Sequence, residues 1–95
     1  MRKTAINSQS QREQFIRKRK QLFWYIKDDA KVHISDEFLV ETILNYGLLE
    51  DVKKLFDVIG LSQTAKIFRK RTRQARCNYL PKVKNYFTLY FRRHA

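Results

Sequence analysis

Apolar residues recur at helical spacing in five stretches of the chain, and short polar stretches separate them. The first ten residues are polar and aperiodic, which predicts a flexible basic arm over residues 1–10. A basic amphipathic helix is predicted over residues 11–27, and it opens a single helical domain over residues 11–95. Its apolar side is formed by Phe15, Ile16, Leu22, Phe23 and Ile26.

Capping residues place the next two helices. Ser35 is suited to an N-cap, and the acids Asp36 and Glu37 follow it in the positive first turn. This second helix is predicted to end at Tyr46, with Gly47 at the position after its last turn. A third helix is predicted over residues 49–59 and is closed by Gly60, because its apolar residues are spaced i, i+3, i+4 and i+7.

The last two predicted helices differ in their apolar faces. Ser62 can cap a fourth helix with a thin apolar face of Ala65, Ile67 and Phe68. Pro81 suits the first position of a final helix with a broad apolar stripe: Val83, Tyr86, Phe87, Tyr90 and Phe91. Two glycines and one proline are too few for a sheet of tight turns. We therefore expect an all-α fold, a compact bundle of about five helices.

Charge divides the chain into three blocks within a net charge of +12. Residues 1–27 carry eight bases and one acid, residues 28–60 three bases and eight acids, and residues 61–95 ten bases and no acid. Such separation predicts a polyanion or an acidic protein surface as the partner.

The residues that usually support catalysis are sparse. His33 and His94 are the only histidines, Cys77 is the only cysteine, and no phosphate-binding glycine loop or metal-ligand spacing occurs. We expect a protein that is not an enzyme and that has no cofactor and no metal. One cysteine and the absence of a long apolar run favour a soluble, cytoplasmic protein without a membrane partner.

Residues 49–74 have the spacing of a helix-turn-helix pair, with a turn at residues 60–62 and a basic second helix. Two positions disagree with this motif, because Lys66 and Arg69 fall where a recognition helix usually turns inward. The alternative is an ordinary helical hairpin with a solvated basic face. The candidate nucleic-acid-binding residues are Gln63, Thr64, Lys66, Arg69, Lys70, Arg71, Arg73 and Arg76.

Aromatic and basic residues near the two ends are candidates for binding a protein partner, because Tyr, Trp and Arg dominate interface energetics. For Trp24 the alternative is a core position that clamps the first helix to the domain, and the tyrosines also permit stacking on RNA bases. The candidate partner-binding residues are Arg17, Lys18, Lys20, Phe23, Trp24, Tyr25, Tyr86, Tyr90, Phe91 and Arg92.

One set of residues in and around the central stretch forms a recognisable pattern: Leu22, Phe23, Trp24, residues 38–47, Leu49, Glu50, Asp51, Leu55, Phe56 and Gly60, and more loosely Asn85, Tyr86 and Phe87. In this pattern the chain resembles a family of small bacterial proteins whose genes often lie beside AbiEii-type nucleotidyltransferase toxins. The resemblance covers about 70 residues. Tyr25 stands where the family has an acid, and residues 1–20 form a basic extension that relatives often lack.

The resemblance implies an antitoxin, or an accessory protein, that acts with an adjacent toxin. Our leading hypothesis is an antitoxin that binds and neutralises a nucleotidyltransferase-type toxin, with operator DNA as a further candidate ligand. The alternatives are a stand-alone DNA-binding regulator that uses residues 62–76 and a basic RNA-binding protein.

Overall fold

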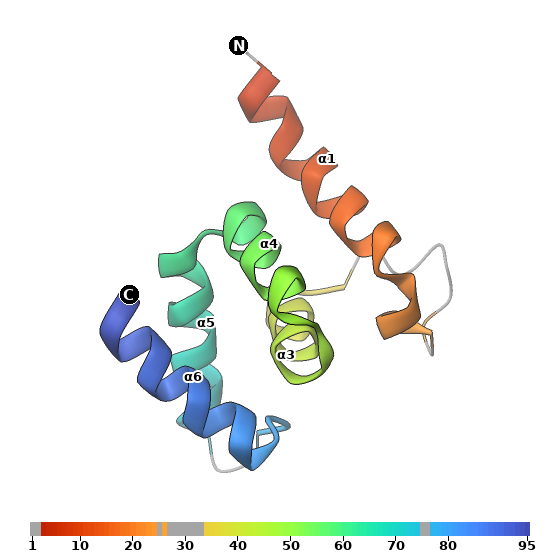
Figure 1. The fold of residues 1–95 in the computed structure, drawn as a ribbon. Coiled ribbons are helices and arrows are strands. Elements are labelled where there is room, and N and C mark those ends of the chain that lie inside the picture. The colour runs from red at the N-terminus through yellow and green to blue at the C-terminus, as the bar shows by residue number, and fades with distance from the viewer. Residues whose placement is uncertain (1–2, 25, 27–33, 75–76) are drawn as a thin grey trace.

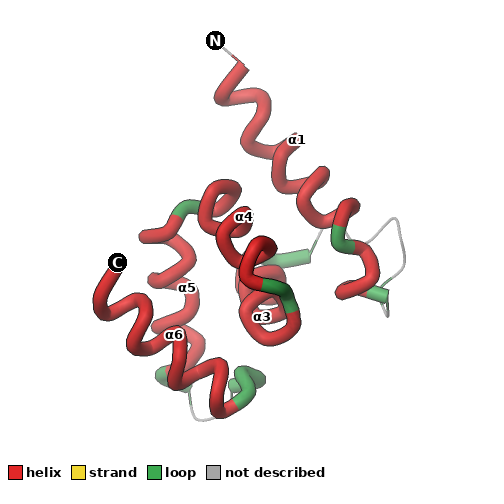
Figure 2. Tube along the Cα trace, in the orientation of Figure 1, coloured by secondary structure: helices red, strands yellow, loops and turns green. Residues whose placement is uncertain are grey.

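The computed structural model describes residues 3–24, 26, 34–74 and 77–95. Within these residues the chain forms five α-helices and one short 3-10 helix without a strand, so the predicted all-α bundle is confirmed (Figure 2). The elements are α1 (Lys3–Lys18), η1 (Lys20–Phe23), α3 (Asp36–Tyr46), α4 (Leu49–Ile59), α5 (Leu61–Thr72) and α6 (Pro81–His94).

The first helix differs from its prediction at both ends. It begins at Lys3 rather than residue 11, so residues 3–10 are helical, while their flexibility stays a prediction. It ends at Lys18, and the chain then turns at Arg19 and continues as η1. Hydrogen bonds between residues i and i+3 form this 3-10 helix, such as Leu22 N–H to Arg19 O at 2.9 Å. The bend directs the two segments to different neighbours, since α1 packs on α4 and η1 on α3.

The predicted starts of α3 and α4 are confirmed. The Ser35 hydroxyl accepts a hydrogen bond from the Phe38 N–H at 3.1 Å, which satisfies an unpaired amide of the first turn. At the next helix, the Leu48 N–H donates to Asp51 Oδ2 at 2.8 Å. Both helices therefore begin with local side-chain support.

Two glycines connect the central helices for different reasons. Gly47 has an extended backbone rather than a left-handed one, and a Cβ there would lie 2.7 Å from Ile43 O. Gly60 has φ +100°, a conformation that side chains rarely adopt, and it alone separates α4 from α5. The predicted three-residue turn and the predicted Ser62 cap are therefore wrong, because α5 already begins at Leu61 with Gly60 as its N-cap.

The core draws on α1, η1, α3, α4, α5 and α6. It consists of Phe15, Ile16, Phe23, Leu39, Val40, Ile43, Leu44, Val52, Leu55, Ala65, Ile67, Phe68, Tyr79, Phe87 and Phe91. Figure 1 shows α1 on one side of the α3–α4 pair and α5 with α6 on the other, while the amino-terminal turns of α1 project away from the body. The described parts of the two basic blocks, α1 with η1 in residues 1–27 and α5 with α6 in residues 61–95, therefore lie on opposite sides of the molecule (Figure 1). We call them the amino-terminal and the carboxy-terminal basic region.

Candidate functional site

The solvent-facing side of α5 carries a row of polar and basic residues. Gln63, Lys66, Lys70 and Arg73 are all exposed, and their spacing of i, i+3, i+7 and i+10 places them on one face of the helix. We call these four residues the α5 stripe. It presents positive charge next to a polar amide, a combination suited to phosphates and base edges.

Lys66 does not occupy the inward position that the motif predicted. It is exposed, and the buried residues of α5 are Thr64, Ala65, Ile67 and Phe68. The helix-turn-helix motif predicted a helix start after a three-residue turn, whereas α5 begins at Leu61, directly after Gly60. The side of α5 that faces the core therefore differs from the side that the motif predicted. This removes one of the two objections to a binding role for α5.

Three of the other candidate residues on α5 serve the fold. Thr64 is fully buried and its hydroxyl donates to Gly60 O at 2.7 Å, so its predicted role in reading bases is wrong. Arg69 is half-buried and donates from Nη2 to Phe91 O at 2.9 Å, which ties α5 to the last turn of α6. The Arg71 Nε lies 3.8 Å from Glu41 Oε2 on α3. Arg76 lies outside the described residues.

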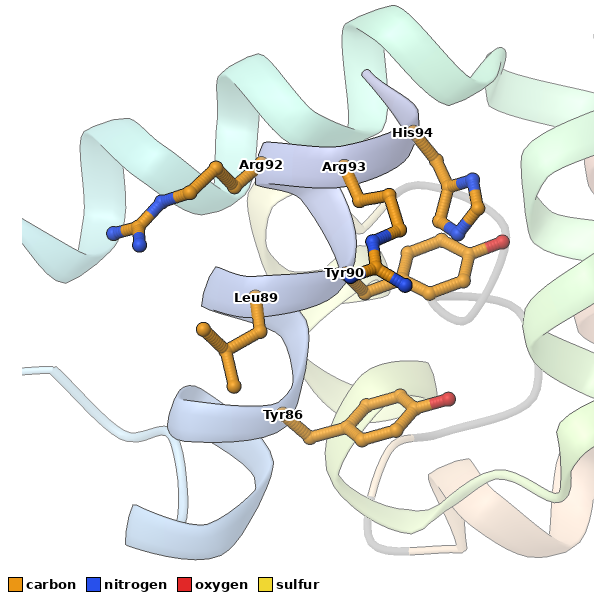
Figure 3. A pocket seen from close by; sticks show the side chains of 6 residues that line it. All are labelled: Tyr86, Leu89, Tyr90, Arg92, Arg93 and His94. Atoms are coloured by element: carbon orange, nitrogen blue, oxygen red, sulfur yellow. The ribbon is translucent and has the colours of Figure 1, made fainter.

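The outer side of α6 holds a second cluster, in which exposed Tyr86 and Leu89 stand beside Arg92, Arg93 and His94. With Tyr90, these residues line a shallow, open depression (Figure 3). The rings of Tyr86 and Tyr90 extend to the same side of the helix and are stacked, with centroids 6.1 Å apart.

One predicted partner residue of α6 lies in the interior. Phe91 is fully buried and contacts the rings of Phe56 and Phe68, at 5.9 and 5.3 Å between centroids. Its role as a partner anchor is therefore wrong, because a helix packed on two neighbours keeps one side for the core. Tyr86 and Arg92 are exposed, and Tyr90 is half-buried.

The amino-terminal candidates also divide between core and surface. Phe23 is fully buried, so the prediction that it contacts a partner is wrong. Trp24 is 78% exposed, so its alternative as a core clamp is wrong as well. Arg17, Lys18 and Lys20 are exposed. Tyr25 lies outside the described residues, as do Lys27, the acids Asp28 and Asp29, and His33.

The structure does not join the two sets of partner candidates. Trp24 follows η1, and its basic neighbours lie at the end of α1 and the start of η1. Tyr86 and Arg92 lie on α6, on the other side of the α3–α4 pair (Figure 1). A single small partner surface therefore does not contact both sets at once.

Sequence reasoning missed an apolar groove between the start of α4 and α6. It is lined by Leu44, Gly47, Leu49, Val52, Lys82, Val83, Tyr86 and Phe87 and has a volume of about 290 Å³. Tyr46, Leu48 and Leu49 are exposed by 61%, 67% and 64% around the junction of α3 and α4. The sequence signal was the apolar pair at residues 48–49, because these two leucines lie outside the apolar positions with which α4 faces the core.

Tyr79 and Glu41 form a buried polar site behind α5. Burial, and secondly the Glu41 carboxylate, raise the pKa of the Tyr79 hydroxyl well above its usual value. Neither the Tyr79 hydroxyl nor Glu41 Oε2 has a hydrogen-bond partner among the described residues. Both side chains are buried, and we assign this site no role in binding.

Among the described residues, no three His, Cys, Asp or Glu side chains gather as a metal site requires. Each described helix is too short or too polar to cross a bilayer. Comparison of the chain with protein-family models, with curated proteins and with solved structures finds no match.

Proposed function

We propose that the protein is an antitoxin, which binds a nucleotidyltransferase-type toxin and covers the mouth of its active-site cleft. Such a cleft holds metal-binding carboxylates, so its mouth is acidic and attracts a cationic protein. The antitoxin contributes no chemistry of its own, and it acts by excluding nucleotide or RNA.

The outer side of α6 is the observation that carries this proposal. It combines an exposed tyrosine with exposed arginines, the residue types that dominate interface energetics. Because residues 61–95 contain no acid, no carboxylate from this segment competes for those arginines. The resemblance of the central stretch to proteins encoded beside such toxins supports the same proposal.

Co-expression with the toxin encoded in the adjacent gene tests the proposal. The wild-type protein is expected to restore growth and to co-purify with the toxin. The double variant Arg92→Glu with Arg93→Glu is expected to lose both. Lys53→Glu with Lys54→Glu is the matched control, because both lysines are exposed on α4 and the change in net charge is equal. Failure of the wild-type protein to restore growth, together with no co-purification, removes the proposal.

Duplex DNA binding through α5 is a second candidate, favoured by the exposure of the whole α5 stripe on one helix face. Each lysine or arginine that neutralises a phosphate adds about 0.9 to the slope of log affinity against log salt. A gel shift with Lys70→Glu and Arg73→Glu is expected to weaken binding and to reduce that slope by about 2. An unchanged slope removes α5 as the DNA-binding element.

A further inference from the structure

The groove lies between the starts of α4 and α6, and its lining includes Leu49 from α4 and Val83 from α6. Farther along the same two helices, Tyr90 stacks on Phe56 of α4 with ring centroids 5.8 Å apart. The groove is therefore next to an aromatic contact between the two helices that line it.

Specific contacts hold this groove in shape. The Asn45 side chain donates to Asn78 O at 3.1 Å and accepts from the Leu80 N–H at 3.0 Å, so the end of α3 anchors the start of α6. Gly47 lies in the groove wall with no space for a Cβ, which allows the close turn from α3 into α4. A binding site that exists before its ligand arrives avoids part of the ordering cost of association.

The groove continues onto the outer side of α6, because Tyr86 lines both depressions. Lys82, Tyr86, Leu89 and Arg93 are spaced i, i+4, i+7 and i+11, which places them in one row along the helix. At 1.5 Å per residue this row is about 16 Å long, the length of about three helical turns. It has apolar residues in the middle and a cation at each end.

We infer that this groove and row, Leu49, Val83, Lys82, Tyr86, Leu89 and Arg93, receive an acidic amphipathic helix of the partner protein. This inference rests on the proposed function and names the part of the partner that is bound. The apolar face of the incoming helix packs in the groove and on Tyr86 and Leu89, as in other helix-in-groove complexes. Its carboxylates, about three turns apart, meet Lys82 and Arg93.

The charge of the chain decides between this occupant and a second copy of the protein. Two copies, each with a net charge of +12, repel each other at long range. A symmetric dimer through this row would also bring together two copies of residues 61–95, which contain no acid to pair with Lys82 or Arg93. An acidic helix of another protein is attracted by the same charges, so we assign the groove to a different protein.

A designed peptide tests the inference on the full-length protein. The probe is a fluorescein-labelled helix of about 16 residues with apolar residues at i, i+3, i+4, i+7 and i+11 and glutamates near both ends. One control peptide has the same composition in scrambled order, and a second has every Glu replaced by Gln. Fluorescence anisotropy at about 150 mM salt measures affinity where long-range attraction is screened. Chemical shifts of the Leu44, Val52 and Val83 methyl groups locate the site.

The variants come in matched pairs. Leu49→Ala and Tyr86→Ala are expected to weaken peptide binding about tenfold or more, as loss of an interface anchor does. Leu48→Ala is the control for Leu49, because it is a neighbouring leucine of equal exposure that does not line the groove. Lys82→Glu is expected to weaken binding about tenfold, whereas Lys54→Glu, on the exposed side of α4, leaves it within about twofold. All five positions are exposed, so the variants are expected to fold, which circular dichroism verifies.

Several outcomes overturn the inference. These are no peptide binding, equal binding of the scrambled peptide, shifts confined to other surfaces, equal effects within either matched pair, or dimers of the protein that form through the groove. Co-expression separates this inference from the proposed function. If the toxin is neutralised as well by the Leu49→Ala variant as by wild type, the groove inference fails alone. If the peptide binds as expected but no toxin is neutralised, the proposed function fails alone.

Discussion

The two basic regions of the molecule use their cations in different ways. In the amino-terminal region, Arg12 and Arg19 point into the molecule and pair with Asp36 and Asp51 at 3.0 and 2.7 Å. In the carboxy-terminal region, the bases of the α5 stripe and of the outer side of α6 are exposed. Two arginines of the amino-terminal region therefore help to attach α1, beside the exposed Arg17, Lys18 and Lys20, whereas most described bases of the carboxy-terminal region are exposed.

The Arg19–Asp51 pair shows how a charge can serve the fold. Both side chains are largely shielded, with 15% and 14% exposure, and Arg19 also lies over the Phe15 ring at 4.1 Å. Asp51 accepts the Leu48 N–H with its other oxygen, so one carboxylate fixes the start of α4 and binds the end of α1. Arg71, in the other region, is 37% exposed and lies 3.8 Å from Glu41, a much weaker pair.

Removal of the Arg19 side chain is expected to have the largest effect. Arg19→Ala leaves Asp51 shielded without its cation, which is expected to lower the free energy of unfolding by about 2–3 kcal/mol. Urea denaturation measures the loss. Arg17→Ala, which removes an exposed arginine from the last turn of α1, is the control and is expected to change stability by no more than about 0.5 kcal/mol. Equal effects of the two variants contradict the assignment of Arg19 to the fold.

Arg12 is expected to contribute less. Its partner Asp36 is 46% exposed and therefore screened by solvent, although Arg12 also donates to Ile34 O. Arg12→Ala is expected to lower the free energy of unfolding by about 1 kcal/mol, again in urea. A loss as large as that of Arg19→Ala contradicts the prediction that an ion pair shielded from solvent contributes more to stability than an exposed one.

Tyr79 reports on the buried polar site that it forms with Glu41, which lies 3.8 Å from Arg71 of α5. Its raised pKa means that the folded protein holds the phenol proton more tightly than the unfolded chain. The resulting stability is complete below the unfolded pKa of about 10 and is lost as pH rises above it, by about 1 kcal/mol at pH 11. Unfolding of wild type and Tyr79→Phe from pH 8 to 11 measures the difference. A constant difference over this range contradicts the prediction.

Removal of exposed charge from the α5 stripe is expected to have the smallest effect on stability. The triple variant Lys66→Gln, Lys70→Gln and Arg73→Gln is expected to unfold within about 0.5 kcal/mol of wild type, since none of the three has a carboxylate partner among the described residues. Thermal unfolding checks it. A loss above about 1 kcal/mol shows that these cations serve the fold, and the contrast between the two regions disappears.

Helix positions were predicted well where a local signal exists. Ser35 and Pro81 marked the starts of α3 and α6, and the apolar period fixed α4, because caps and periodicity act within one or two turns. The break at Arg19 was missed because the apolar pattern continues through it. That break depends on packing of η1 against α3, which is distant in sequence.

Exposure of individual candidates was predicted less well. Phe23 and Phe91 are core residues and Trp24 is exposed, although all three belong to apolar or aromatic runs of similar appearance. Thr64 lies on the basic helix but faces inward. Which side of a helix is buried depends on the helices that pack against it, and the local sequence pattern does not specify those neighbours. The groove is lined by residues of α4 and α6, which are distant in sequence, and it was unpredictable for the same reason.

The projection of α1 has a consequence for amide hydrogen exchange. A lone helical segment shorter than about 12–15 residues is marginal in water, and the first turns of α1 lie away from the body (Figure 1). Amides near Lys3 should therefore exchange with deuterium through local fraying of the helix end. Amides near Phe15 and Ile16, whose side chains are buried in the core, should exchange only when a larger part of the protein unfolds. A steep protection gradient is expected along this single helix, with its boundary near the level of α4.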